Sequence, residues 1–139
     1  MIQLIVGKKG KGKTKALLDR VNEEVKNILG NVVFLDKSSK HMYELNNKIR
    51  LIDVPEFGVS TPESFVGFVA GIISQDHDLQ QIYVDSFLKV ASLEDQDISD
   101  TVAKLEALSE KYSVDMILSV STDKQDLPEK YRSNVIMAL

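Results

Sequence analysis

Residues 7–14 read Gly7-Lys8-Lys9-Gly10-Lys11-Gly12-Lys13-Thr14 and are the most informative part of this chain of 139 residues. They match the pattern G-x-x-x-x-G-K-[ST], whose glycines let successive backbone N–H groups turn inward around phosphate oxygens. In this pattern the lysine, here Lys13, reaches the β- and γ-phosphates, and the hydroxyl, here that of Thr14, ligates Mg²⁺. The stretch therefore predicts a phosphate-binding loop.

The segments on either side of this loop agree with that interpretation. Such a loop follows a buried strand and opens a helix, and residues 2–6 have the composition of a strand. After the loop, apolar residues recur at helical spacing at Leu17, Val21, Val25, Ile28 and Leu29. Gly30 stands where a glycine that ends a helix is expected. The sequence thus predicts strand, loop and helix in the required order.

Length and composition limit the class of protein. A chain of 139 residues suffices for one domain with a substantial core, so we expect residues 1–139 to form a single phosphate-loop domain. There is no cysteine, so any metal would need oxygen or nitrogen ligands. No secretory signal is visible, and we expect a cytoplasmic location. The most apolar stretch, residues 65–73, is shorter than the ~20 residues of a membrane span.

Positive charge is concentrated at the start of the chain. The formal net charge is −4, yet the first fifteen residues contain no acid and five lysines, namely Lys8, Lys9, Lys11, Lys13 and Lys15. This asymmetry indicates a local anion site on an otherwise acidic body. It disfavours a broad surface for the nucleic-acid backbone.

Strand and helix patterns alternate along the rest of the chain. Further strands are expected at residues 31–36, 80–84, 114–120 and 131–139, with residues 48–54 as an additional candidate. Helices are expected from Thr61-Pro62-Glu63 onward and over residues 98–112, and residues 37–47 are expected to be a loop or a short helix. This alternation predicts an α/β fold, a three-layer α/β/α sandwich around a mainly parallel sheet of about five strands.

The helix that starts after Thr61 is apolar almost all round. Such a helix is expected to be buried against the sheet on one side and against a second neighbour on the other. A partner subunit is one candidate for that neighbour, so a protein partner or a homo-oligomer is an open expectation.

Asp85 is the candidate for the second half of the site. It is the first charged residue after the hydrophobic strand pattern of residues 80–84. A carboxylate at the end of a strand next to a phosphate loop can hold Mg²⁺ through its water shell. A buried aspartate that caps a turn is the structural alternative.

Residues 7–14 together with Ile82-Tyr83-Val84-Asp85 resemble the P-loop NTPase superfamily, and the expected element order resembles its RecA-like branch. Residues 7–10, 41–43, 67–68, 71–76 and 82–85 are also similar to small, uncharacterised bacterial ATP-binding proteins, some labelled twitching-motility ATPase. The resemblance implies a P-loop NTPase fold that binds ATP and Mg²⁺. It implies catalytic roles for Lys13 and Asp85, metal ligation by Thr14 and Asp85, and nucleotide contacts at Gly7, Lys8, Lys9, Gly10, Lys11, Gly12, Lys13, Thr14 and Lys15.

RecA-like enzymes commonly place a glutamate beside this aspartate or on a neighbouring strand to activate water, whereas this chain has Ser86. Three other acids could take the place of this glutamate, namely Asp36, Asp53 and Glu56, and the sequence does not decide among them. Hydroxyls that could sense a γ-phosphate, or be ordinary strand-end hydroxyls, are Ser119, Ser121 and Thr122. Tyr131 and Arg132 are candidates for contact with adenine.

Three functions are compatible with these motifs. The expected one is a slow Mg-dependent ATPase or ATP-dependent switch, and the alternatives are a small-molecule kinase with a RecA-like core and a deviant Walker A partitioning-type ATPase. Kinases of that kind carry a glutamate after the aspartate and a cysteine-bearing lid, and this chain has neither feature. Proteins of the deviant class carry glycine where this chain has Lys9. Residues 123–126 miss the guanine-reading pattern N/T-K-x-D at their first position, which favours ATP over GTP.

Sheet order separates these functions. A strand between the loop strand and the Asp85 strand favours the RecA-like class. Direct adjacency of those two strands favours kinases, GTPases or the deviant class.

Overall fold

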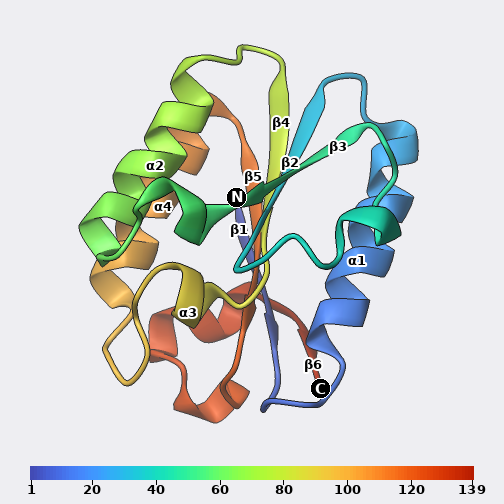
Figure 1. Cartoon of the computed structure of the whole chain (residues 1–139). Coiled ribbons are helices and arrows are strands. Elements are labelled where there is room, and N and C mark those ends of the chain that lie inside the picture. The colour runs from blue at the N-terminus through green and yellow to red at the C-terminus, as the bar shows by residue number, and fades with distance from the viewer.

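The computed structural model describes residues 1–139 and contains one six-stranded sheet in which all neighbouring strands are parallel (Figure 1). The strands are β1 (Ile2–Val6), β2 (Asn31–Asp36), β3 (Ile49–Asp53), β4 (Leu79–Val84), β5 (Asp115–Val120) and β6 (Val135–Ala138). Their order is β3-β2-β4-β5-β1-β6, so β5 lies between β1 and β4. The predicted α/β class is confirmed.

The expected strand number of about five is one too low. The extra strand is β3, which pairs with β2 along its whole length and forms one edge of the sheet. The tail forms strand β6 at the opposite edge, beside β1. The four inner strands carry near-continuous apolar runs, as expected for parallel strands that are covered on both faces.

Helices cover both faces of the sheet, but unequally. One face is covered by a single α-helix, α1 (Lys13–Glu24), and the other by α2 (Pro62–Ser74), α3 (Phe87–Val90) and α4 (Ser99–Tyr112) (Figure 1). The core under α1 has 10 buried residues, and the core on the other face has 25. Short 3-10 helices lie at Val25–Asn27, Met42–Glu44, Val54–Phe57, Lys124–Asp126 and Glu129–Asn134.

Helix α2 begins as predicted, because the Thr61 hydroxyl accepts a hydrogen bond from the Ser64 N–H in a reciprocal capping box. Its inner face buries Phe65, Val69 and Ile73. The expected second neighbour belongs to the same chain: α2 lies beside α4, and the Phe57 ring packs against Phe68 at a centroid distance of 5.9 Å. None of the helices has both the length and the apolar character needed to cross a membrane.

The role predicted for Gly30 is wrong. Helix α1 ends at Glu24, a 3-10 turn follows, and Ile28 is extended, so no helix reaches Gly30. Gly30 has no positive φ, but a Cβ atom there would lie 2.1 Å from the carbonyl oxygen of Asp78. The glycine is therefore needed for close approach of two backbone segments, which the hydrogen bond from the Asn31 N–H to the Asp78 carbonyl (2.7 Å) fixes in place.

Because all strands are parallel, their carboxyl ends lie together at one edge of the sheet, the lower edge in Figure 1. The loop after β1, Asp85 after β4 and Ser121 after β5 all lie at this edge. Ligands of open parallel sheets bind at such an edge.

We expect Gly30→Ala to lower the free energy of unfolding by about 1–3 kcal/mol, because the added methyl group overlaps the Asp78 carbonyl. Gly67→Ala in α2 is the matched control, since its methyl group meets nothing within 4 Å. This control should stabilise the protein by about 0.5–1 kcal/mol through helix propensity. Urea unfolding followed by circular dichroism measures both, and equal effects would contradict the close approach at Gly30.

Candidate functional site

The loop between β1 and α1 has the backbone of an anion site. Gly10 and Gly12 adopt φ angles of +85° and +94°, which residues other than glycine rarely adopt. Gly12 directly precedes α1, whose first turn has no side-chain cap and no acidic residue. Lys13 and Thr14 are the first two residues of that helix. The exposed N–H groups and the positive end of the helix dipole therefore suit a phosphate.

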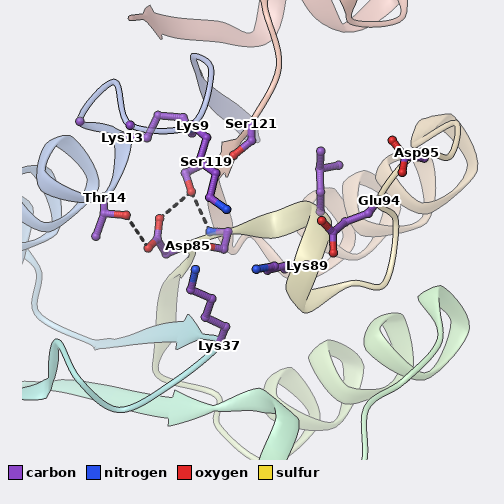
Figure 2. A pocket seen from close by; sticks show the side chains of 14 residues that line it. Lys9, Lys13, Thr14, Lys37, Asp85, Lys89, Glu94, Asp95, Ser119 and Ser121 are labelled. Carbon is purple, nitrogen blue, oxygen red and sulfur yellow. Dashed lines mark hydrogen bonds between the residues drawn. The ribbon is translucent and has the colours of Figure 1, made fainter.

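Asp85 connects this loop to the centre of the sheet (Figure 2). Its Oδ2 atom accepts a hydrogen bond from the Thr14 hydroxyl at 2.9 Å, and its Oδ1 atom accepts one from the Ser119 hydroxyl at 2.6 Å. The carboxylate is buried, with 3% of the residue exposed. Two neutral donors thus hold a buried carboxylate in one orientation at the start of the helix.

The oxygen atoms around Thr14 fit a magnesium ion. The Thr14 hydroxyl uses its proton on Asp85, which leaves its lone pairs available to a cation. No group of three or more acidic or histidine side chains gathers in the chain, so phosphate oxygens and water would supply most ligands. Magnesium is commonly bound in this way, with one or two protein groups and the phosphates of its substrate.

The structure places Ser119 as a bridge within the protein. Its hydroxyl donates to Asp85 and accepts from the Ser86 N–H at 2.9 Å. Because its only proton is used on Asp85, Ser119 has no donor for a γ-phosphate. Ser121 is exposed and lines the cavity described below, whereas the Thr122 hydroxyl lies 3.4 Å from the Asp123 carbonyl.

Ser86 has a strained backbone. Its φ of 54° and ψ of 50° lie in the left-handed region, which costs a residue other than glycine about 1 kcal/mol or more. This conformation directs its N–H to Ser119 and starts α3 immediately after Asp85. The chain therefore turns sharply away from the end of β4, beside the cavity.

Lys13 lies close to the loop backbone. Its Nζ atom donates to the Lys8 carbonyl at 3.1 Å, and 8% of the residue is exposed. Burial lowers the pKa of the Lys13 amine below its usual value, and the charge of Asp85 opposes this shift. A buried cation with only a carbonyl partner is well placed to bind an anion.

A cavity of about 430 Å³ joins these elements, within the range of small-molecule sites. Its lining is almost entirely polar, with Leu88 as the one hydrophobic residue. The lining residues are Lys9, Gly10, Gly12, Lys13, Thr14, Lys37, Asp85, Ser86, Leu88, Lys89, Glu94, Asp95, Ser119 and Ser121. Such a lining suits phosphate groups better than an aromatic base.

Of the ten residues predicted to bind nucleotide or metal, six line this cavity, namely Lys9, Gly10, Gly12, Lys13, Thr14 and Asp85. The others lie around it. Lys8 pairs with Asp123 at 3.4 Å, Lys15 pairs with Asp19 at 2.8 Å, and Lys11 is exposed. Gly7 is buried against the last residue, since a Cβ atom there would lie 3.0 Å from the Leu139 carbonyl oxygen.

The two candidate adenine contacts both make hydrogen bonds within the protein, but only Tyr131 is buried, whereas Arg132 is exposed and lines a neighbouring cavity. The buried Tyr131 donates its hydroxyl to the Ser99 carbonyl at 3.2 Å. Arg132 donates to the carbonyls of Leu127 and Gln125 at 3.3 and 2.8 Å.

Asp36 differs from the other candidate acids. It is the last residue of β2, the strand beside β4. The carbonyl of Leu35, the residue before Asp36, accepts a hydrogen bond from the Asp85 N–H at 2.9 Å. Asp36 is 1% exposed; its Oδ1 atom accepts from the Lys37 N–H at 2.7 Å, and its Oδ2 atom has no partner. Burial, helped by the charge of Asp85, raises the pKa of Asp36 to about 6, although the Lys37 N–H opposes the shift. Asp53 is half-buried, and Glu56 is exposed.

Sequence reasoning missed Lys37 and Lys89, which line the cavity from outside the loop motif together with the acidic residues Glu94 and Asp95. Lys37 follows directly after a predicted strand, and the end of a parallel strand was an available signal. Lys89 lies in α3, a single helical turn that no periodic pattern announces.

A scan against known protein families finds no match to this chain. A search of curated proteins finds no significant similarity.

The pKa of Asp36 predicts how stability depends on pH. Because its folded-state pKa of about 6 exceeds the unfolded value of 3.8, the folded state binds more protons between these values, and stability falls as pH rises through this range. We expect Asp36→Asn to raise the free energy of unfolding by on the order of 2 kcal/mol at neutral pH, with a smaller gain below about pH 4.

Chemical denaturation across this pH range measures the effect. Asp53→Asn is the matched control, since Asp53 pairs with Asp36 in the sheet register but is only half-buried. A gain from Asp36→Asn that is the same at both ends of the range would contradict the burial of a charged carboxylate.

Proposed function

We propose that this protein binds Mg-ATP in the cavity at the start of α1 and acts as a slow ATPase or an ATP-dependent switch. The observation that carries the proposal is the 2.9 Å hydrogen bond between Thr14 and Asp85, which joins residues 71 positions apart. It brings together the hydroxyl and the strand-end carboxylate that a magnesium nucleotide requires. The cluster of lysines in the cavity adds the positive charge that a triphosphate needs.

The sheet order supports a P-loop fold of the RecA-like class. Strand β5 lies between the loop strand β1 and the Asp85 strand β4. This order disfavours the deviant Walker A alternative. The same alternative needs Lys8 to act across a dimer, whereas Lys8 pairs with Asp123 of its own chain.

The surroundings of Asp85 support slow turnover. The next residue, Ser86, directs its N–H to Ser119, and no glutamate stands at this position. The other buried acid at this edge of the sheet, Asp36, does not line the cavity. Glu94 and Asp95 also line the cavity, but they lie between α3 and α4 and not on the Asp85 strand. No carboxylate therefore stands beside Asp85 on its own strand to activate water.

One observation favours a kinase as the second candidate. A cavity of about 640 Å³ adjoins the phosphate cavity and shares Leu88, Asp95 and Ser121 with it. It has five hydrophobic lining residues, in contrast to the single one in the phosphate cavity. This second cavity offers room for the base of the nucleotide or for an acceptor molecule, and nucleotide turnover that rises only with an added acceptor would favour the kinase.

We expect Lys13→Ala to weaken Mg-ATP binding by about 100-fold or more, because a desolvated cation on the phosphates contributes several kcal/mol. Lys15→Ala is the matched control. It removes the same charge only two residues further along the chain, from a lysine that pairs with Asp19. Isothermal titration calorimetry measures both variants. Equal affinity of wild type and Lys13→Ala would refute the proposed site.

We expect the isolated protein to release phosphate from ATP slowly, below the turnover of about 1 per second at the low end of typical enzymes. A continuous phosphate-release assay, with Lys13→Ala as the background, measures this rate. Fast basal release would show that a water-activating group acts at this site.

A further inference from the structure

Two lysines from outside the loop motif face Asp85 across the cavity. Lys37 follows β2, and Lys89 lies in α3. In Figure 2 the Lys37 amine points toward Asp85, and the Lys89 amine reaches toward the same space from α3. Thr14 lies on the other side of the carboxylate. The lysines thus extend the positive lining beyond the phosphate loop.

Neither lysine has a partner within the protein. No ion pair of the chain includes Lys37 or Lys89, and neither ammonium group makes a hydrogen bond. Asp85 keeps its negative charge while the hydroxyls of Thr14 and Ser119 hold its oxygens, and Glu94 and Asp95 line the same cavity. None of these carboxylates forms an ion pair with Lys37 or Lys89. With Lys9 and Lys13, four ammonium groups line one cavity. A bound anion with several charges would supply the partners that Lys37 and Lys89 lack within the protein.

The position of the lysines indicates which part of a triphosphate they reach. In the G-x-x-x-x-G-K-[ST] pattern the loop amides hold the inner phosphates, and the lysine and the metal lie between the β- and γ-phosphates. A terminal phosphate bound in this way would extend past Asp85, toward the part of the cavity that Lys37 and Lys89 line. We propose that Lys37 and Lys89 bind the γ-phosphate from opposite the loop and make the protein distinguish ATP from ADP. This inference rests on the proposed nucleotide site.

The two lysines connect the γ-phosphate to two different segments. Lys37 begins the connection of residues 37–48. The far part of this connection is fixed to α1 by the side-chain amide of Asn22, which donates to the Glu44 carbonyl at 2.8 Å and accepts from the Asn46 N–H at 2.7 Å. Lys89 belongs to the single turn of α3 that follows the strained Ser86. A γ-phosphate would hold the start of both segments, and its loss would free them together. The proposed switch thereby gains a physical basis.

Calorimetry with two probes tests the inference: the magnesium complexes of ADP and of a non-hydrolysable imido analogue of ATP. Wild type is expected to bind the analogue more tightly than ADP. Lys37→Ala and Lys89→Ala should each weaken analogue binding by about tenfold, the effect of one charge-assisted hydrogen bond. ADP affinity should change by less than about twofold. Lys37→Arg, which keeps the charge, should restore most of the preference.

Lys40→Ala is the matched control, since it removes the same charge from an exposed residue of the same connection that does not line the cavity. We expect it to leave both affinities unchanged. Equal loss of ADP and analogue binding in the Lys37 and Lys89 variants, or no loss in either, would overturn the γ-phosphate assignment while the nucleotide site stands. Failure of the wild type to bind both probes would overturn the proposed function itself.

Discussion

The site depends on the hydrogen bond between Thr14 and Asp85, which joins the start of a helix to the end of a central strand. A buried carboxylate needs donors, and the Thr14 hydroxyl is one of the two that hold Asp85. The parallel sheet makes this contact available because β1 and β4 end at the same edge. Ser119, on the strand between them, supplies the second donor and completes the orientation of Asp85.

Local patterns of the sequence predicted most of the fold. Strand β2 covers residues 31–36 as expected, and α2 begins after Thr61 because a capping hydroxyl followed by proline is a strong local signal. The edge strand β3 was harder to predict from the sequence, since a half-buried strand has a weaker apolar pattern. Gly30 was misread because its reason lies in a backbone segment about fifty residues away, at Asp78.

The candidate site could be predicted only where one motif carries the chemistry. The loop and Asp85 follow from sequence patterns, and the structure adds that they touch. Lys37 and Lys89 carry no motif, and their relation to Asp85 comes from the order in which β2, β4 and α3 lie at the sheet edge. Asp36 was one acid among several in the sequence, and only burial with an unpartnered oxygen distinguishes it from Asp53 and Glu56.

The unequal cores have a consequence for dynamics. The layer formed by α1 buries far fewer residues than the layer formed by α2, α3 and α4, and local opening occurs most readily where least apolar surface is buried. Backbone amides of α1 should therefore exchange with deuterated solvent sooner than those of α4. A ligand held by the first turn of α1 would stabilise the closed form of this layer by RT ln(1 + [L]/Kd), so slower exchange of the α1 amides would report binding in the cavity.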